Sequence, residues 1–388
     1  MKPTIFFTFC VMLCQSSFAL GTKDSTLIAT TSSIISNTIP LPEEVNQPLL
    51  WIKNRQLSNG LVESAEGSNF VSLYDNALAA LVYTIHDDRE STEKILDYFS
   101  HRLDTEFIEF GGGYYQFRRG DGSQTRRKWI GDNAWLLIAI NHYSERFSSS
   151  KYETMALALE NWLRTQQAED GGLWGGIQAN GKRIHKITEG IITAFNAVPG
   201  YDDFHKGILL YLKENRWDQK ESLLLAWPEN PKYQYAMDLH SLGSLIYPTL
   251  SDQLLTKADR YGTRQISSIN GQKIRGYCFD EDKDVIWLEG TAQMALAFNQ
   301  SGMEEEGKQL IREIKKTLIY SKTNDSVAGV PYSVNQGTNY GESKLWEHAD
   351  QAAAISSSAW YVFALKNFNP FKQAGNKNVP AADKFWLR

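Results

Sequence analysis

The sequence predicts an all-α protein, an (α/α)6 barrel in which six helical hairpins form two concentric rings. The first observation behind this prediction is a repeat. An acidic residue followed by an almost wholly apolar stretch returns about every 50 to 60 residues, a period typical of repeated supersecondary units. The six copies start at Asp75, Asp132, Glu189, Asp238, Glu289 and Asp350. They favour one closed array over the two domains that 388 residues could form.

The second observation is that two kinds of helix alternate. The stretches 133–140 and 291–298 are apolar nearly all round, as expected for helices that are buried on every side. The segments 151–165, 203–216 and 306–318 are amphipathic and should have one face in water. Alternation of the two kinds predicts an inner ring and an outer ring. An open stack of hairpins is the alternative architecture.

The third observation is the length of the connections. The link from an inner to the next outer helix is short, as at Asp87-Asp88, whereas the link from an outer to the next inner helix is long. Long loops inside a compact domain are usually functional. All the long links should emerge on the face where the inner helices begin. They are expected at roughly 58–73, 104–130, 167–187, 217–236, 262–287 and 321–349.

The N-terminus has the pattern of a secretory signal peptide. Lys2 is followed by an apolar stretch over 5–13, and Ser17 and Ala19 provide small residues at the two cleavage positions. The apolar stretch is too short to span a membrane as a mature helix. We therefore expect a secreted or periplasmic protein with no stable membrane insertion after cleavage. Cleavage would leave Cys278 alone, without an internal disulfide.

The chain then divides into four segments. Residues 1–19 are the expected signal peptide, and 20–40 form a Ser/Thr-rich linker that Pro40 and Pro42 close. The toroid domain should span 41–371. Residues 372–388 form a polar tail that we expect to be loose.

The overall charge excludes one class of partner. A formal net charge of −5 and a pI near 5.9 give no sign of nucleic-acid binding. The 11 Trp, 18 Tyr and 18 Phe residues mostly fill a core, but some are available as flat faces for a ligand.

The six acidic residues of the repeat are candidates for catalysis. Capping of a helix N-terminus explains any one of them, since a carboxylate there accepts free N–H groups. Capping does not require all of them to face one site. Glycoside hydrolysis does require two carboxylates, one protonated and one ionised. We expect Asp132 and Glu289 to be the catalytic pair, with Asp75 and Glu189 as close substitutes.

Aromatic and polar side chains of the long loops are candidates for substrate binding. Aromatic faces with polar edges suit pyranose rings, although each ring could equally pack its loop onto the barrel. A basic cluster around 118–128 could recognise carboxylate or sulfate on an acidic glycan, and a solvated loop is the ordinary alternative. The predicted binding residues are Trp129, Trp174, Trp227, Trp287, Trp346, Tyr115, Tyr277, Arg127, His185, Asp238 and His348.

No metal or cofactor is expected. The run Asp280-Glu281-Asp282-Lys283-Asp284 is similar to a calcium loop, but Val285 stands where an EF-hand needs Gly. We interpret the run as an exposed acidic turn. The histidines lack metal-binding spacing, and there is no Gly-x-Ser-x-Gly nucleophile motif.

Several of these motifs resemble the six-hairpin glycosidase superfamily, in particular a group of bacterial exported proteins. The resemblance covers about Leu73 to Phe371. It rests on 74–79 (YDNALA), 129–135 (WIGDNAW), 188–190 (TEG), 287–295 (WLEGTAQMA) and 359–361 (AWY). It implies the (α/α)6 fold, with carbohydrate chemistry at the N-terminal face of the inner helices. Relatives often have His-Asn after the acid of the third motif, where this chain has Gly190-Ile191.

Four functions are compatible with the sequence. The leading hypothesis is an exported glycoside hydrolase acting on a polysaccharide or oligosaccharide. A polysaccharide lyase on an acidic glycan would use Tyr or His as the base, and a glycan-binding protein would need no catalytic acids. A terpenoid-processing toroid is disfavoured because its aspartate-rich metal motif is missing.

Overall fold

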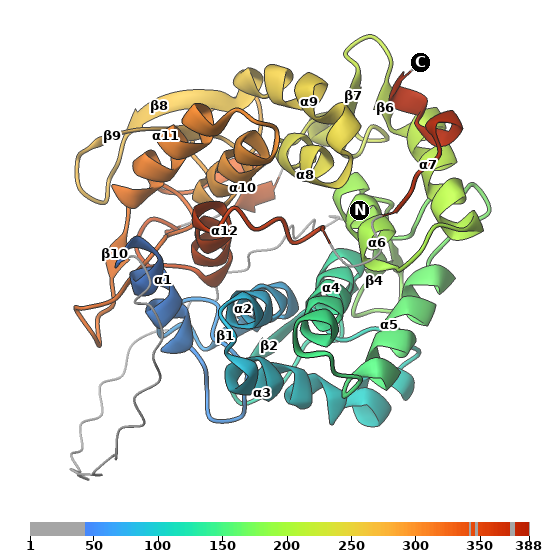
Figure 1. Ribbon diagram of the computed structural model, residues 1–388, viewed down its shortest axis with the longest axis horizontal. Coiled ribbons are helices and arrows are strands. Elements are labelled where there is room, and N and C mark those ends of the chain that lie inside the picture. The colour runs from blue at the N-terminus through green and yellow to red at the C-terminus, as the bar shows by residue number, and fades with distance from the viewer. Residues whose placement is uncertain (1–42, 341–342, 346–347, 373–376, 388) are drawn as a thin grey trace, which may run out of the picture.

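The computed structural model describes residues 43–340, 343–345, 348–372 and 377–387. The expected signal peptide, the linker and Trp346 lie outside these residues. Viewed down its shortest axis, the domain is a toroid with an inner and an outer ring of helices (Figure 1). The (α/α)6 barrel that the sequence predicts is confirmed, with two concentric rings in place of the open solenoid.

Six apolar helices form the inner ring. They are α2 (Leu73–Ile85), α4 (Ile130–Phe147), α6 (Thr188–Ala197), α8 (Asp238–Ile246), α10 (Leu288–Gln300) and α12 (Ile355–Leu365). Each contacts the next around the ring, and α12 contacts α2, which closes it. Nearly every residue of α10 from Leu288 to Phe298 is buried, as its all-round apolar sequence predicts.

The outer ring consists of six helices that pack against the inner helices from outside. Its members are α1 (Glu43–Lys53), α3 (Arg89–Ser100), α5 (Glu153–Thr165), α7 (Asp203–Asn215), α9 (Ser251–Lys257) and α11 (Glu304–Lys315). Each inner helix from α2 to α10 packs on the outer helix that follows it in the chain. The helix α1 packs on α12, so the beginning of the domain completes the sixth hairpin at its end.

Short strands and irregular helices make up the long loops. The strands are β1 (Phe70–Ser72), β2 (Phe117–Arg119), β3 (Lys128–Trp129), β4 (Gly176–Ile177), β5 (Arg183–Ile184), β6 (Trp217–Asp218), β7 (Leu223–Leu224), β8 (Gly262–Ile266), β9 (Lys273–Tyr277), β10 (Ile319–Tyr320), β11 (Ala328–Gly329), β12 (Thr338–Tyr340) and β13 (Ser343–Leu345). Single turns are a π-helix at Leu103–Ile108 and 3₁₀ turns at Pro231–Tyr233, Pro248–Leu250, Ala258–Tyr261, Ala381–Asp383 and Phe385–Leu387.

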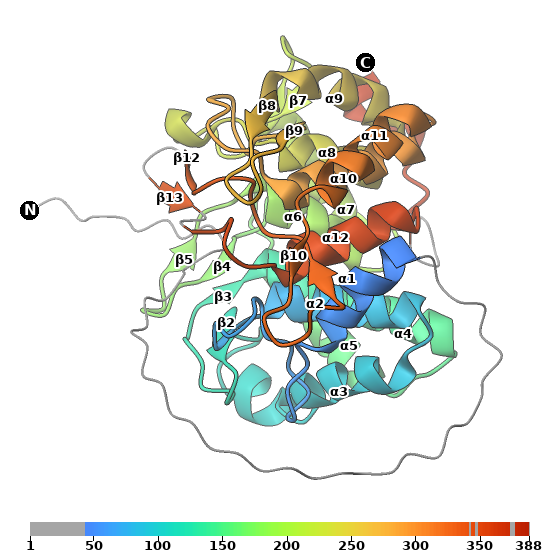
Figure 2. The same ribbon diagram turned by 90° about the vertical axis from the view of Figure 1, so that its left-hand side faces the viewer.

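Most of these loops lie on one face of the toroid (Figure 2). Two of the sheets join one loop to the next. In the antiparallel pair β1–β2, Phe70 is opposite Arg119, and β3, β4 and β5 form a three-stranded sheet with Trp129 opposite Gly176. The loops are therefore tied together around the face where the inner helices begin.

One main-chain hydrogen bond recurs at the start of every inner helix. The N–H of one residue, which we call the anchor residue, donates to a carbonyl oxygen in the following loop of the ring over 2.8 to 3.1 Å. The pairs are Leu73 to Gln116, Ile130 to Gly175, Thr188 to Ala226, Met237 to Phe279, Leu288 to Tyr332, and Ile355 to Ser64. The last pair returns to the loop before α2 and closes the cycle. All six helices therefore begin on the same face.

A polar side chain three residues after the anchor holds the preceding loop in four of these helices. Asn133 accepts from Tyr114 N over 2.8 Å and donates to Tyr114 O over 3.1 Å and to Trp129 O over 2.9 Å. Asn76 pairs in the same way with the main chain of Val62. Thr291 and Ser358 accept from the N–H groups of Tyr277 and Val330. These side chains satisfy buried main-chain groups that water does not reach.

Two expectations need correction. The sixth inner helix does not start near Asp350, which lies in a turn five residues before Ile355 and accepts a hydrogen bond from Ser268. The tail is not loose in its described part, because Phe385 and Trp386 are buried and its 3₁₀ turns pack on α7. Trp386 Nε1 donates to Thr249 Oγ1 over 3.0 Å. Aromatic side chains in this otherwise polar segment supply the apolar surface that fixes it.

No helix in the described part of the chain has the length and apolar character needed to cross a membrane.

The role of Asn133 as a loop anchor can be tested by replacement with Ala. The substitution removes the hydrogen bonds that Asn133 makes with the buried N–H and carbonyl of Tyr114, and each buried group left unsatisfied costs about 1–3 kcal/mol. We expect Asn133→Ala to lower the free energy of unfolding by about 3 kcal/mol or more in chemical denaturation. Asn215→Ala, which loses one half-buried bond to Tyr211 O, is the control. Equal losses in the two variants would contradict the anchoring role.

Candidate functional site

The residue immediately after each anchor residue occupies what we call the axial position. From α2 to α12 these residues are Tyr74, Gly131, Glu189, Asp238, Glu289 and Ser356. Tyr74 Oη donates to Glu289 Oε1 over 2.7 Å, although α2 and α10 are separated by α12 in the ring. A bond between helices that are not neighbours must cross the region of the axis. The axial side chains therefore converge at the centre of the loop face.

Three carboxyl groups meet at this centre. Glu189 is affected electrostatically by Asp238 and by Glu289, and Asp238 also acts on Glu289. They come from α6, α8 and α10, which are consecutive around the ring. Asp238 and Glu289 are buried, with 6% of each exposed, and Glu189 is half-buried. Each of these three helices thus places the acid at its axial position into one shared space that is largely shielded from water.

This environment raises the pKa of all three carboxyl groups. Burial and the neighbouring Asp238 and Asp132 raise the pKa of Glu189 to about 8. Burial raises the pKa of Asp238 to about 7. Burial also raises the pKa of Glu289 to about 7, against the lowering effect of the hydrogen bond from Tyr74. Loss of hydration and repulsion between like charges both favour the protonated form. At neutral pH the group therefore contains protonated and ionised carboxyls side by side.

Asp75 and Asp132 lie one residue further along α2 and α4. Asp75 contacts the hydroxyls of Ser64 and Ser72, and burial raises its pKa to about 6. Burial raises the pKa of Asp132 to about 8, and Arg127 lowers it. Asp75 Oδ1 and Asp132 Oδ2 are buried atoms without a hydrogen-bond partner among the described residues. Both groups are buried, with 2% of Asp75 and 3% of Asp132 exposed.

Side chains one helical turn after the axial positions donate hydrogen bonds to the axial side chains. Thr193 Oγ1 donates to Glu189 Oε1 over 3.2 Å, and Gln293 Nε2 donates to Glu289 Oε1 over 3.3 Å. Trp360 Nε1 donates to Tyr74 Oη over 2.7 Å. The rings of Trp135 and Trp360 lie 5.7 Å apart and fill the barrel beneath. The floor of the site is thus an aromatic core with a few directed donors.

An aromatic layer covers the starts of α6, α8 and α10. Its rings contact one another in a continuous chain with centroids 4.9 to 5.5 Å apart. The members, in order, are His185, Trp227, Tyr233, Tyr340, Phe279 and Trp287. They belong to four different loops. Tyr340 lies close enough to Asp238 for the carboxylate to raise its pKa.

Comparison with solved structures identifies the architecture. A glycosidase matches with a TM-score of 0.57 and 10% identity, over 84% of this chain and 96% of the other. A glycosidase variant in complex with glucose matches with a TM-score of 0.57 and 11% identity, over the same shares of the two chains. An α-amylase from Clostridium perfringens matches with a TM-score of 0.59 and 15% identity, over 84% and 98% of the two chains. A D-mannose isomerase matches with a TM-score of 0.59 and 11% identity, over 85% and 99%.

The chain has the six-hairpin fold of these glycosidases. No protein-family model matches the sequence, and no curated protein does. At 10–15% identity the likeness defines the fold alone. The chemistry of this six-hairpin toroid must therefore be argued from its own site.

The toroid brings together some of the predicted binding residues. Trp129 is buried beside the catalytic candidates, since a Cβ on Gly131 would lie 2.7 Å from Trp129 Nε1 and 3.1 Å from Glu189 Oε2. The Arg127 guanidinium lies over the Trp129 ring, 5.3 Å from its centroid. Trp227, Trp287 and His185 belong to the aromatic layer. Of these rings, His185 alone is exposed.

Other predicted residues lie elsewhere. Trp174 is half-buried between Arg183 and Lys186 of its own loop, 5.2 and 5.1 Å from its ring. Tyr115 is buried under Phe110. Tyr277 lines a separate cavity of about 460 Å³ with Arg264 and Arg275. His348 is exposed in the turn before α12.

The basic residues around 118–128 do not form one surface. Arg118 is buried in an ion pair with Glu106, 2.9 Å between Nη2 and Oε1. Lys128 Nζ donates to the carbonyl oxygens of Phe110 and Gly112, each over 2.6 Å. These two side chains hold the loop together, which leaves Arg127 as the cation of this cluster that acts on Asp132.

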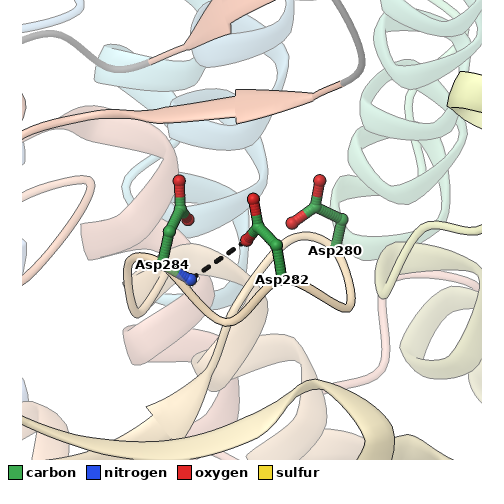
Figure 3. Close-up of side chains that lie close together, drawn as sticks. All are labelled: Asp280, Asp282 and Asp284. Atoms are coloured by element: carbon green, nitrogen blue, oxygen red, sulfur yellow. Dashed lines mark hydrogen bonds between the residues drawn. The ribbon is translucent and has the colours of Figure 1, made fainter.

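The acidic run after β9 forms a cluster of its own (Figure 3). The carboxylate oxygens of Asp280, Asp282 and Asp284 lie within 4.8 Å of one another. Asp282 and Asp284 are exposed, and Thr338 Oγ1 donates to Asp284. Exposed acidic groups of this kind are common without an ion, so we assign no metal to them.

Sequence reasoning missed Tyr74, Gln293, Trp360 and Ser356. Their signal appears only when the copies are aligned on the anchor residues. Tyr74 and Ser356 then fall in the column of Glu189 and Glu289, and Gln293 and Trp360 fall four residues later, on the same helix face.

The buried acids should make stability depend on pH above neutrality. A carboxyl whose pKa is higher in the folded protein than in the unfolded chain contributes stability that is complete below about pH 4 and is lost as the pH rises through the folded pKa. The range from about pH 6.5 to 8.5 covers the pKa of the two acids with the highest values. In this window Asp132 and Glu189, each with a pKa of about 8, still hold protons. We expect the melting temperature to fall across it.

Replacement of Asp132 by Asn isolates the contribution of one buried carboxyl to this dependence of stability on pH. Thermal melts of Asp132→Asn should show a shallower decline than the natural chain between about pH 6.5 and 8.5. Glu304→Asn, at an exposed position on α11, should leave the slope as it is. A decline of the same slope in Asp132→Asn would contradict a raised pKa at this residue.

Proposed function

We propose that this protein is a glycoside hydrolase acting on a polysaccharide or oligosaccharide, with Glu189 and Glu289 as its paired carboxyls. The observation that carries the proposal is the convergence of axial acids from three consecutive inner helices, α6, α8 and α10, in a largely buried site. Such a site keeps one carboxyl protonated while another is ionised, as glycosidic bond cleavage requires. The protonated group donates to the leaving oxygen, and the ionised group serves as base or nucleophile.

Axial placement favours Glu189 over the earlier choice of Asp132. Glu189 is half-buried, and its Oε2 lies beside the Trp129 indole, whereas Asp132 is 3% exposed and lies one residue after the axial position. Asp132, Asp75 and Asp238 remain candidates for accepting hydrogen bonds from sugar hydroxyls, since each has a buried oxygen without a partner among the described residues.

The fold supports carbohydrate chemistry without selecting the reaction. Glycosidases, an α-amylase, a sugar epimerase and a mannose isomerase share it. Interconversion of free sugars is therefore the second candidate, because buried carboxyls that exchange protons can also act at a carbon next to a carbonyl. Export of the protein through its N-terminal segment remains part of the proposal.

A glycan screen separates the candidates. Purified protein is incubated with neutral and anionic glycans and with free aldoses and ketoses. New reducing ends without ultraviolet absorbance support the hydrolase, and absorbance of an unsaturated uronate indicates a lyase. Interconversion of free sugars, followed by NMR, indicates an isomerase or epimerase. Binding without any product indicates a glycan-binding protein.

Replacement of either carboxyl should abolish most of the activity found. We expect Glu189→Gln and Glu289→Gln each to lower kcat by about 10²–10⁴-fold, the contribution of a positioned acid or base. Their melting temperatures should not fall, since the amides remove repulsion between buried acids.

Glu304→Gln, at the exposed start of α11, is the control and should retain full activity. If Asp132→Asn lost activity while both glutamate variants kept it, the pair would be wrongly assigned.

A further inference from the structure

The donors around Glu289 are arranged with a fixed direction. The indole N–H of Trp360 can only donate, and it donates to Tyr74 Oη over 2.7 Å. The single proton of the Tyr74 hydroxyl is then directed to Glu289 Oε1, 2.7 Å away. The hydrogen bond from Trp360 therefore orients the Tyr74 hydroxyl so that it donates to the Glu289 carboxylate.

A second relay reaches the same oxygen from within the barrel. The Ser241 hydroxyl donates to Gln293 Oε1 over 2.9 Å, which turns the amide nitrogen of Gln293 toward Glu289. Gln293 Nε2 lies 3.3 Å from Glu289 Oε1. Two donors therefore share Oε1, and neither of them engages Oε2. A carboxylate oxygen that accepts two hydrogen bonds is suited to the ionised form.

Within the described part of the chain, Glu189 has a longer hydrogen bond from its own helix and three neighbouring acids. Its carboxyl accepts from Thr193 over 3.2 Å, and the carboxyls of Asp132, Asp238 and Glu289 act on it from three helices. The groups that face Glu289 are Tyr74 and Asp75 of α2, Glu189 of α6, Asp238 of α8 and Ser356 of α12. No cation is among them, so hydrogen bonds are what distinguish the two glutamates.

We propose that Tyr74 and Gln293 are positioning residues that keep Glu289 ionised, with Trp360 setting the direction of the Tyr74 hydroxyl. Glu289 is then the base or nucleophile, and Glu189 is the acid that holds the proton. The assignment of roles rests on the proposed hydrolase activity. The effect of Tyr74 on the ionisation of Glu289 does not depend on it.

Infrared titration tests the effect on Glu289 without a substrate. The absorption of protonated carboxyls is followed against pH, and the part that is lost in Glu289→Gln is assigned to Glu289. In Tyr74→Phe this part should titrate about one pH unit higher, the size expected for loss of one hydrogen bond to a charged group. Gln293→Met should shift it in the same direction, and it provides the test if Tyr74→Phe does not fold. An unchanged titration in the folded variants would overturn the proposal.

The pH dependence of kcat/KM tests the roles in catalysis. If Glu289 must be ionised, Tyr74→Phe should move the acidic limb upward by about one pH unit, so that the loss of activity is largest at low pH. Trp360→Phe should cause a smaller shift of the same sign. A merely structural effect would lower activity by the same factor at every pH, and a shift of the basic limb would exchange the roles of the two glutamates.

Tyr143→Phe is the matched control. Tyr143 also donates to a glutamate, Glu93, but on the outer side of α4. Tyr143→Phe should change neither the infrared titration of Glu289 nor the pH dependence of kcat/KM. If the infrared shift appears and no glycan is cleaved, the positioning role stands and the hydrolase proposal fails.

Discussion

The closed cycle of main-chain hydrogen bonds at the inner-helix starts is the constraint on which this structure depends. Each anchor N–H needs a partner because the start of a buried helix leaves its first donors unsatisfied. The following loop supplies that partner, so every loop is fixed by the helix before it in the ring. The bond from Ile355 to Ser64 joins the last copy to the first. Closure therefore places all six axial positions around one centre.

This geometry explains why acids at the axial position behave differently from ordinary helix caps. A capping carboxylate at a surface helix is hydrated and has a low pKa near the positive end of the dipole. Here burial and neighbouring carboxyls outweigh that effect, and the pKa of Glu189, Asp238 and Glu289 rises. Loss of hydration dominates, since burial is the largest cause of each of these shifts. The toroid thus produces proton donors at neutral pH from residues that would be ionised on a surface.

The six copies are not equivalent, and their differences define the site. Glu189, Asp238 and Glu289 supply acids from one half of the ring, while Tyr74, Gly131 and Ser356 stand at the same position in the other half. Gly131 lets the Glu189 carboxylate and the Trp129 indole approach the main chain of α4, since a Cβ there would lie 2.7 Å from Trp129 Nε1. Tyr74 reaches across to Glu289. A repeated scaffold therefore carries an asymmetric arrangement, with three acids on one side and a hydrogen-bond donor and a glycine on the other.

The sequence by itself determined the fold and the positions of five of the six inner-helix starts. Apolar patterning and repeat spacing are local properties, and burial of all-round apolar helices leaves few alternatives to a double ring. The start of the sixth inner helix was predicted too early, at Asp350, because an acid before an apolar stretch does not reveal which residue makes the anchor hydrogen bond. Only the tertiary structure decided that Tyr74 and Gln293 hold Glu289, that the acids are buried, and that Arg118 and Lys128 brace their loop. Those properties depend on which side chains meet across the axis, and contacts between helices far apart in the chain leave no periodic signal in the sequence.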